Sequence, residues 1–445
     1  MILRSVIMAM CLALVGWMLS SCSTEQKPYY DVALVSKAQE VEPYIRQAKY
    51  MTDQGVNWRS VPDSSWETWN HALYNGTPGI ALFYLELFNA TGDSLYLEEA
   101  KLGADYVMNN VPDTLPSEYF LGLYVGIAGQ GFVLSEAYQV TKHEPYKQAA
   151  LSMVPILREA SQSTEHGLVF PVTDIMYGAA GIGLFLHYLA AQYDVPEATQ
   201  LAQELADGLM DIATDSLGAL RWKSEEADEY FMDNFSHGTA GVAYFLSETY
   251  RKTGKEKYLK AAEQAVKGMD WFTNEQGFIS HHAPGGEDLH YLSWCHGPAG
   301  TSRLFYSLYK ATEDPQWLER IELAASSIMA ERIDSLQTPG YWNNISKCCG
   351  AVGVAEYLLW VHQATGKEEY LAYANTLTET VERKATSVEN SLKWVQAEHR
   401  GYPEYLMAQS GLMQGSAGVG LWYLKLAAYQ QGNPPRILFP DEPRL

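Results

Sequence analysis

The sequence predicts an all-α fold, a single α/α toroid of seven helix-pair repeats, and two periodic features indicate it. The first is the motif Gly-x-x-Gly, called the phrase below, which occurs seven times and is followed each time by an apolar run. Its leading glycines lie 50 to 65 residues apart, a period typical of repeat architectures. These glycines are Gly76, Gly126, Gly178, Gly238, Gly297, Gly350 and Gly415.

The second feature is an amphipathic segment between successive phrases. Residues 93–110, 256–271 and 315–332 carry Leu, Ala and Met at helical spacing among charged positions. They are expected to form half-exposed outer helices, whereas the apolar runs, which have almost no polar face, are expected to form buried inner helices. Seven such pairs are expected to form a ring with the Gly-x-x-Gly loops at one end, because glycine permits tight turns and close backbone approach.

The ends of the array and some short Gly-flanked pieces complete the predicted ring. Residues 32–50 have a helical pattern and are expected to supply the outer helix that is missing at the start. Residues 167–171 and 277–280 are expected to form small hairpins on the rim. No linker interrupts the array, so residues 32–445 are predicted to be one domain.

The N-terminus has the pattern of a bacterial lipoprotein signal. Arg4 is followed by an apolar stretch over residues 6–19 and then by Leu-Ser-Ser-Cys, which ends at Cys22. Residues 1–21 are therefore predicted to be a signal peptide, and residues 22–31 a polar tether that begins with a lipidated Cys22. An ordinary signal peptide or a membrane anchor is the alternative, although the apolar stretch is short for a spanning helix.

The N-terminal pattern, the net charge and the composition indicate where the protein is located and which partners it can bind. The lipoprotein pattern predicts an exported protein of the cell envelope, facing the periplasm or the cell surface and held to the membrane by its N-terminal lipid only. The net charge of −22 leaves no basic surface to neutralise phosphates, which argues against a nucleic-acid partner. With 47% hydrophobic residues, the chain has enough apolar material for a large core and is not expected to be disordered.

Three cysteines remain in the folded part, because the signal peptide and the lipidated residue account for the other two. Cys295 stands at the fifth phrase, and Cys348 and Cys349 stand at the sixth. Three thiols at neighbouring inner-helix starts suit Zn²⁺, which takes thiolates in tetrahedral sites and leaves a fourth position open for water or a substrate thiol. Three alternatives remain open: a vicinal disulfide between Cys348 and Cys349, three inert core thiols, and His296 in place of one cysteine.

The residue before each leading glycine indicates where chemistry is concentrated. If the loops converge at one mouth of the toroid, these side chains face a common centre. Polar residues concentrated in copies four to six therefore suggest a site at that mouth. From the first copy to the seventh, the residues are Asn75, Val125, Tyr177, His237, His296, Cys349 and Gln414.

The seven phrases, the Trp-Cys-His-Gly motif at Cys295 and the Cys-Cys-Gly motif at Cys348 together resemble the LanC family of lanthionine synthetase cyclases and LanC-like proteins. The resemblance covers residues 69–429, nearly the whole mature chain. It implies a zinc ion held by Cys295, Cys348 and Cys349. Most family members have His at the third position, and the additional thiolate is expected to make a bound thiolate more nucleophilic.

The resemblance also implies residues that handle protons. His237 matches the family's histidine before the glycine of the fourth repeat, and Asp174 matches an aspartate shortly before the glycine of the third. Histidine is the natural acid and base near neutral pH, and Asp174 is expected to hold its ring or take a proton. Family cyclases often carry Arg four residues before the first zinc cysteine, where this chain has Tyr291. The loss of that cation weakens the case for full cyclase activity, although a tyrosine hydroxyl can still donate to a developing oxyanion.

The leading functional hypothesis is a zinc-dependent LanC-like enzyme that activates a thiol for addition to an electrophile such as a dehydroamino acid, which gives a thioether or lanthionine. Its expected partner is a thiol-containing peptide or a small thiol. Zinc would lower the pKa of the thiol, and His237 would protonate the resulting enolate with the help of Asp174. An exported address is unusual here, because such enzymes normally meet their precursor peptides in the cytoplasm.

Two other functions remain open. The α/α toroid also carries many glycosidases, lyases and epimerases, and a carbohydrate-active enzyme requires two acidic residues facing the toroid centre, with Asp174 or Asp233 as candidates. The last alternative is a non-catalytic protein that binds zinc and thiols, which the replacement of Arg by Tyr291 keeps open.

Overall fold

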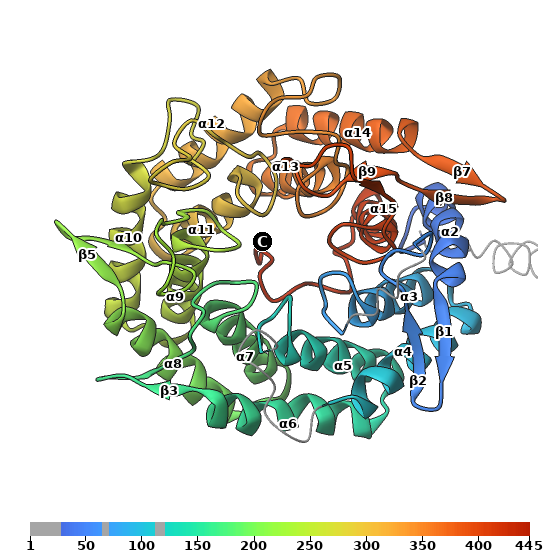
Figure 1. Ribbon diagram of the computed structural model, residues 1–445, viewed down its shortest axis with the longest axis horizontal. Helices are drawn as coiled ribbons and strands as arrows, with labels where there is room; N and C mark the ends of the chain where they lie inside the picture. Colours follow the sequence, from blue (N-terminus) through green and yellow to red (C-terminus); the bar gives the residue numbers. More distant parts are fainter. Residues whose placement is uncertain (1–27, 65–70, 112–120) are drawn as a thin grey trace, which may run out of the picture.

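The computed structural model describes residues 28–64, 71–111 and 121–445, and this part contains fourteen α-helices and ten short β-strands. Figure 1 shows the helices as two concentric rings around a common axis. The predicted all-α toroid of seven helix pairs is therefore confirmed. The predicted signal peptide, most of the tether and Cys22 lie outside the described residues. Within the described ranges, no helix has the length and apolarity needed to cross a membrane.

The inner ring consists of seven helices, each fifteen residues long and each beginning directly after a leading glycine. Their first two or three turns are almost entirely buried, because they face both the axis and the outer helices. These helices are α3 (Thr77–Thr91), α5 (Ile127–Thr141), α7 (Ala179–Tyr193), α9 (Thr239–Thr253), α11 (Pro298–Thr312), α13 (Ala351–Thr365) and α15 (Ser416–Gln430).

The outer ring consists of the amphipathic helices, and six of them pack against the inner helix that precedes them in the chain. The seventh is α2, whose partner is α15, so the two ends of the array join and close the ring. The helix expected within residues 32–50 is present but ends at Gln47. The outer helices are α2 (Val32–Gln47), α4 (Ser94–Asn109), α6 (Glu144–Ala160), α8 (Pro196–Asp211), α10 (Glu256–Asp270), α12 (Gln316–Ala330) and α14 (Glu368–Arg383).

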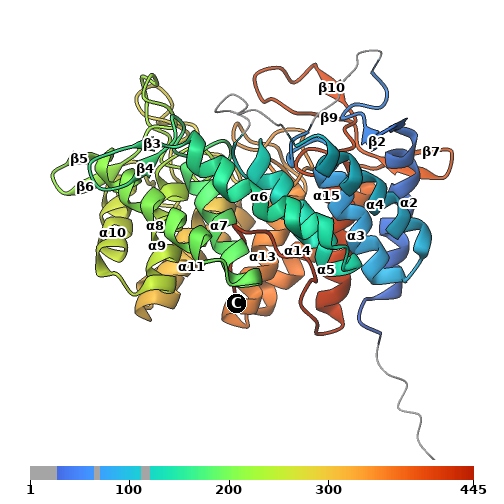
Figure 2. The ribbon, with the colours of Figure 1, turned by 90° about the horizontal axis from the view of Figure 1, so that it is seen from below.

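The strands form five two-stranded antiparallel sheets, and Figure 2 shows several of them gathered at one end of the barrel. The hairpin expected at residues 167–171 is present as β4 paired with β3, whereas residues 277–280 contribute only an isolated bridge between Thr273 and Ile279. The pairs are β1 (Lys49–Thr52) with β2 (Gly55–Trp58), β3 (Gln162–Ser163) with β4 (Leu168–Val169), β5 (Thr214–Ser216) with β6 (Ala219–Arg221), β7 (Thr386–Val388) with β8 (Ser391–Lys393), and β9 (Gln396–Ala397) with β10 (Leu406–Met407).

A closed circle of backbone hydrogen bonds joins the seven Gly-x-x-Gly loops. The residue two positions before each leading glycine makes these bonds. Its backbone carbonyl accepts a hydrogen bond from one neighbouring loop and, with one exception, its backbone N–H donates to the carbonyl of the loop on the other side, at 2.7 to 3.2 Å. The exception is the third copy, where the N–H of Ile175 donates in place of that of Met176. The residues in the circle are Tyr74, Tyr124, Met176, Ser236, Cys295, Cys348 and Met413. Equivalent residues of neighbouring copies are therefore held next to one another.

The second glycine of the phrase is required by close packing inside each loop. It lies against the carbonyl of the residue six positions earlier, and a Cβ on Gly181 would stand 2.1 Å from the Ile175 oxygen. No real Cβ approaches a backbone atom so closely, so the loop or the start of the helix would have to move. The repeat of the phrase therefore reflects the same steric requirement in all seven copies.

We expect Gly181→Ala to lower the free energy of unfolding by about 1–3 kcal/mol, the range in which forced overpacking falls. Urea unfolding followed by circular dichroism measures it. Gly401→Ala is the control, because a Cβ there meets only the ring of the exposed His399, and a loss below about 0.5 kcal/mol is expected. Equal losses in the two variants would contradict the packing explanation.

Candidate metal centre and active site

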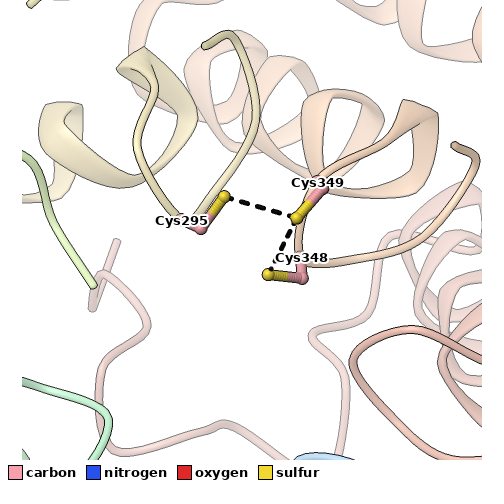
Figure 3. A group of neighbouring side chains, drawn as sticks. All are labelled: Cys295, Cys348 and Cys349. Atoms are coloured by element: carbon pink, nitrogen blue, oxygen red, sulfur yellow. Dashed lines mark hydrogen bonds between the residues drawn. The ribbon is translucent and has the colours of Figure 1, made fainter. Parts of the chain in front are cut away.

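The three cysteines of the folded part meet at the loop end of the barrel. Cys295 and Cys348 occupy equivalent positions of consecutive copies, and the N–H of Cys295 donates to the Cys348 carbonyl at 3.2 Å. Cys349 follows directly in the chain, and Figure 3 shows its sulfur between the other two. Its Sγ lies 3.4 Å from the sulfur of Cys295 and 3.2 Å from that of Cys348. The circle of loops is thus what brings residues 54 positions apart into one cluster.

The cluster has the composition and spacing of a metal site. All three Sγ atoms lie within 4.8 Å of one another, and the three residues are free cysteines. Sulfur ligands about 2.3 Å from a tetrahedral zinc ion lie about 3.8 Å from one another, so small side-chain movements would suffice to accommodate the ion. Cys295 and Cys348 are buried, whereas Cys349 is partly exposed. The three thiols can therefore hold a metal and leave one side of it open.

Gln414, from the last copy, fixes the position of the Cys349 sulfur. Its Nε2 donates to Cys349 Sγ at 3.4 Å and to the Tyr74 hydroxyl at 3.0 Å. The Asn344 amide donates to Gln414 Oε1 at 3.1 Å, which turns the NH₂ group of Gln414 toward the thiol. Gln414 is the residue before a leading glycine, the position that the sequence comparison singled out.

The environment shifts the pKa values of the three thiols in different directions. Burial raises the pKa of Cys295 and of Cys348, because no water is available to solvate their thiolates. The pKa of Cys349 is lowered well below its usual value by hydrogen bonds with the Cys295 and Cys348 thiols, and the Gln414 amide contributes further. A single negative charge in the cluster is therefore expected to reside on Cys349.

His237 is held by a buried carboxylate. Its Nδ1 lies 2.8 Å from Oδ2 of Asp174, a residue with no exposed surface, whereas the imidazole is 24% exposed. Asp174 also accepts from the Ser224 hydroxyl at 2.7 Å and from the Tyr177 N–H at 2.7 Å. A carboxylate in these contacts acts as acceptor, so Nδ1 of His237 carries the proton and Nε2 remains for chemistry. The position of Asp174 favours holding the ring over taking a proton from a substrate.

Three further histidines form a cluster beside His237. The ring of His296 packs 4.3 Å from that of His281 and 5.6 Å from that of His237, measured between centroids. Burial and the neighbouring histidines lower the pKa of His296 well below its usual value, and burial lowers that of His281 to about 4. His281 and His296 are therefore neutral at neutral pH. Nδ1 of His281 lies 2.9 Å from Nδ1 of His282.

The Tyr291 hydroxyl accepts a hydrogen bond from an arginine side chain, which the sequence analysis did not predict. Nε of Arg400, in the segment between β9 and β10, donates to the Tyr291 hydroxyl at 3.4 Å. Burial raises the pKa of Tyr291, with a smaller opposing effect of the Arg400 hydrogen bond, so the hydroxyl keeps its proton at neutral pH. The pair therefore offers an O–H donor supported by a cation.

These groups line one pocket of about 390 Å³ at the loop end. The structure brings together there five of the six catalytic and metal residues expected from the sequence, while Asp174 stands behind His237. Of the residues before the leading glycines, those of copies four to seven line the pocket. The five expected residues are His237, Tyr291, Cys295, Cys348 and Cys349.

Sequence reasoning missed Arg400, Glu398, His281 and His282, which also line the pocket. All four lie in segments between the repeats, where no periodic pattern exists from which to infer their position. The one available signal was that these loop segments contain adjacent pairs of basic or histidine side chains, His281 with His282 and His399 with Arg400.

The fold and the site together define an α/α toroid with a cluster of three thiols at the mouth of its axis. The model of the lanthionine synthetase C-like protein family matches residues 67–439, and the chain belongs to that family. A relative named glutathione S-transferase LANCL1, from Danio rerio, is 22% identical over 67% of this chain and 71% of its own length.

Solved structures share the fold. Nisin cyclase superposes with a TM-score of 0.62 at 18% identity, covering 90% of this chain and 96% of its own. The Lin0763 protein from Listeria innocua superposes with a TM-score of 0.51 at 11% identity, covering 89% of this chain and 97% of its own. At these identities the two structures support the toroid alone.

Proposed function

We propose that this protein is a zinc-dependent enzyme that adds a thiol to an electrophilic alkene such as a dehydroamino acid and so forms a thioether. The observation that carries the proposal is the cluster of three sulfur atoms within 4.8 Å of one another, in a pocket that also holds a carboxylate-supported histidine. The family supports it, and so do the names of two similar proteins, a cyclase and a glutathione S-transferase. Glutathione is itself a thiol peptide, which supports a thiol-containing peptide or small thiol as substrate.

Cys295, Cys348 and Cys349 would hold the zinc ion. The metal, when bound, lowers the pKa of a coordinated thiol so that thiolate is present at neutral pH. Three thiolates suit zinc better than harder cations, because soft sulfur ligands select it. Gln414 stabilises negative charge on Cys349 through its amide N–H.

The remaining residues would carry out the proton and charge transfers. The sulfur of the substrate thiolate forms a bond to the β-carbon of the alkene, and the electron pair of the double bond moves to the carbonyl oxygen as an enolate. His237 then delivers a proton from Nε2 to the α-carbon, and Asp174 holds the ring and stabilises its charged form, reached when His237 takes up the thiol proton. Ser224 completes the support of Asp174.

The Tyr291 hydroxyl would donate to the enolate oxygen as negative charge develops on it. Arg400 lies 3.4 Å away and adds a positive charge beside that hydroxyl, which strengthens it as a donor. In this proposal, a cation from the segment between β9 and β10 takes the place of the arginine that Tyr291 replaces.

We expect Tyr291→Phe to lower the rate of thioether formation by roughly 10²-fold and Arg400→Ala by roughly tenfold, since one oxyanion donor contributes about 10²–10³. Neither variant is expected to change the zinc content, because neither side chain holds the metal. Steady-state assays with a thiol and a dehydroalanine peptide measure the rates, and Arg400→Lys should recover part of the loss. Rates equal to the parent's in the first two variants would contradict the assignment.

The carbohydrate-active alternative finds less support. It requires two carboxylates that face a substrate, but Asp174 is fully buried beneath His237. Asp233 is 2% exposed and bound by both Arg221 and Thr239. Among the described residues that line the pocket, Glu398 is the one carboxylate. The non-catalytic alternative would show metal and thiol binding without turnover.

The predicted lipid anchor implies a direction in which the pocket faces relative to the membrane. The N–H of Asp31, which caps the start of α2, donates to the carbonyl of Ala427 near the end of α15, opposite the Gly-x-x-Gly loops. We propose that a lipid on Cys22 anchors this end, so that the pocket faces away from the membrane. Metabolic labelling with a fatty-acid analogue, in the parent and in Cys22→Ala, tests the anchor.

The test of the function itself is direct. Purified protein is assayed for zinc and then given glutathione and a dehydroalanine peptide. Bound zinc and adduct formation above the rate without protein are expected. Protein that binds no metal, or adduct formation unaffected by Cys295→Ser, would remove the proposal.

A further inference from the structure

The C-terminal segment enters the axis of the barrel from the end opposite the pocket. After α15 the chain turns inward, and Figures 1 and 2 show its end near the centre of the ring, at the end away from the hairpins. Residues 439–442 are buried. The ring of Phe439 packs 5.5 Å from that of Phe132 in α5. We call residues 437–442 the plug.

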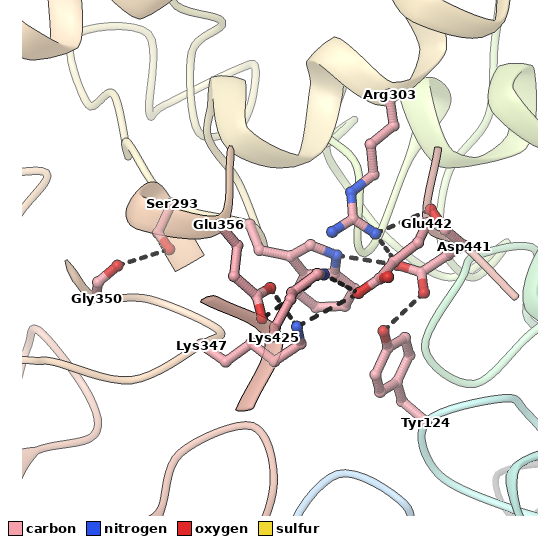
Figure 4. A network of polar contacts seen from close by, with 10 residues as sticks. Tyr124, Ser293, Arg303, Lys347, Gly350, Glu356, Lys425, Asp441 and Glu442 are labelled. Carbon is pink, nitrogen blue, oxygen red and sulfur yellow. Dashed lines mark hydrogen bonds and ion pairs between the residues drawn. The ribbon is translucent and has the colours of Figure 1, made fainter. Parts of the chain in front are cut away.

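Asp441 of the plug, which has no exposed surface, contacts one residue of an inner helix and two residues of the Gly-x-x-Gly loops. It accepts from the Tyr124 hydroxyl at 2.9 Å and from the Trp294 indole N–H at 3.1 Å, and it pairs with Arg303 of α11. The Arg303 guanidinium also donates to the Asp441 backbone carbonyl at 2.9 Å. Figure 4 shows Asp441 between Arg303 and Tyr124.

Glu442, the next residue, joins a second group of charges. It pairs with Lys425 of α15 at 2.8 Å and with Lys347 at 3.7 Å, and Lys347 also pairs with Glu356 of α13. Lys347 is 4% exposed. A lysine is tolerated at such a position only with carboxylate partners, and the plug provides one of them.

The repeat shows that Lys347 is exceptional. It lies six residues before the second glycine of its phrase, where each of the other copies has an apolar or aromatic residue. Those residues are Leu73, Leu123, Ile175, Phe235, Trp294 and Leu412. The two plug carboxylates thus reach the two members of this set that offer an N–H donor, Trp294 and Lys347.

These two residues directly precede cysteines. Trp294 is bonded in the chain to Cys295, and Lys347 to Cys348. We propose that Asp441 and Glu442 are positioning residues for the thiol cluster, which fix the two cysteine-bearing loops from beneath through Trp294 and Lys347. The proposal rests on the proposed metal site and deepens it, because it makes the C-terminus part of the support of that site.

Two features explain why such support matters. The hydrogen bonds of the loop circle fix only the backbone at Cys295 and Cys348, whereas the plug holds the side chains that precede these cysteines in the chain. Metal ligands tolerate errors of about 0.2 Å, and loss of residues that orient ligands typically lowers metal affinity 10–100-fold.

The experiment compares zinc affinity of the full-length protein with that of Asp441→Asn and Glu442→Gln, by competition with a chromophoric chelator. Glu99→Gln is the matched control, because Glu99 is also buried in a lysine ion pair, with Lys49, but lies on outer helix α4. Affinity 10–100-fold weaker in both plug variants and unchanged in the control is expected. Unchanged affinity in folded plug variants would overturn the inference.

Two further measurements keep the inference testable if the plug variants fold poorly. Trp294→Phe keeps an aromatic ring but removes the indole donor to Asp441, and cobalt-substituted protein reports the geometry through its sulfur-to-cobalt absorption band, which is expected to shift. A band identical to the parent's would overturn the inference. If the parent binds no metal, the proposed function fails. The rate at which the cysteines react with a disulfide reagent is then compared between the parent and Trp294→Phe. A changed rate would support the positioning role of the plug, and an unchanged rate would overturn it.

Discussion

Replacement of Cys295 by serine is expected to lower zinc affinity by more than about 100-fold and to reduce thioether formation to the rate without enzyme. A serine hydroxyl is a poor ligand for zinc beside two thiolates, and even residues behind the ligands contribute about 10–100-fold to affinity. Cys295 also contributes the 3.4 Å contact that lowers the pKa of Cys349. Elemental analysis of the purified variant and a thiol-consumption assay measure the two effects.

The matched variant is Cys349→His, which keeps a zinc ligand at the position where most family members have histidine. It is expected to retain zinc and to lose rate, because a neutral imidazole donates less charge to the metal than a thiolate and leaves a bound thiol less nucleophilic. Full zinc content in Cys295→Ser, or loss of zinc from Cys349→His with Cys295→Ser unaffected, would contradict the ligand assignment.

Replacement of Asp174 by asparagine is expected to lower the rate by about 10²–10⁴-fold with the zinc content unchanged. The asparagine amide can turn its NH₂ toward His237 Nδ1, which would move the imidazole proton to Nε2 and leave the ring in the wrong tautomer. His237→Gln is expected to lose as much, because it removes the proton carrier itself. Single-turnover kinetics with a dehydroalanine peptide measure the effect.

Ser224→Ala provides the control for this effect. It removes one hydrogen bond to Asp174 and leaves the contact between Asp174 and His237 in place, so a loss of no more than about tenfold is expected. Asp174→Asn with the parent's rate, or a loss of zinc in either Asp174→Asn or His237→Gln, would show that the pair has a structural role instead.

The fold was predictable because its main constraint recurs. Each copy needs the second glycine of its phrase for the same steric reason, and each inner helix is apolar because it is buried on nearly every side. The partner of α2 was less evident, because the sequence pattern shows a missing helix without showing that α15 is the inner helix it covers. The bridge at residues 277–280 depends on local contacts that no periodic pattern contains.

The candidate site was predictable as far as the repeat extends. Cys295 and Cys348 occupy equivalent positions of consecutive copies, so the repeat predicts that they lie close together. Arg400 lies outside the repeat, and its contact with Tyr291 depends on how an irregular segment folds back over the pocket. The plug was equally hidden, although a lysine, Lys347, in an otherwise apolar set was a sign that a carboxylate had to approach it.

The most direct test of thiol activation is zinc content combined with turnover in a single preparation. The purified protein is expected to contain zinc equimolar with the chain and to join glutathione to a dehydroalanine peptide, as detected by the mass of the adduct. Activity should disappear when a chelator removes the metal and return when zinc is restored. Metal-free protein that forms the adduct at the same rate, or zinc-loaded protein that forms none, would contradict the proposed function.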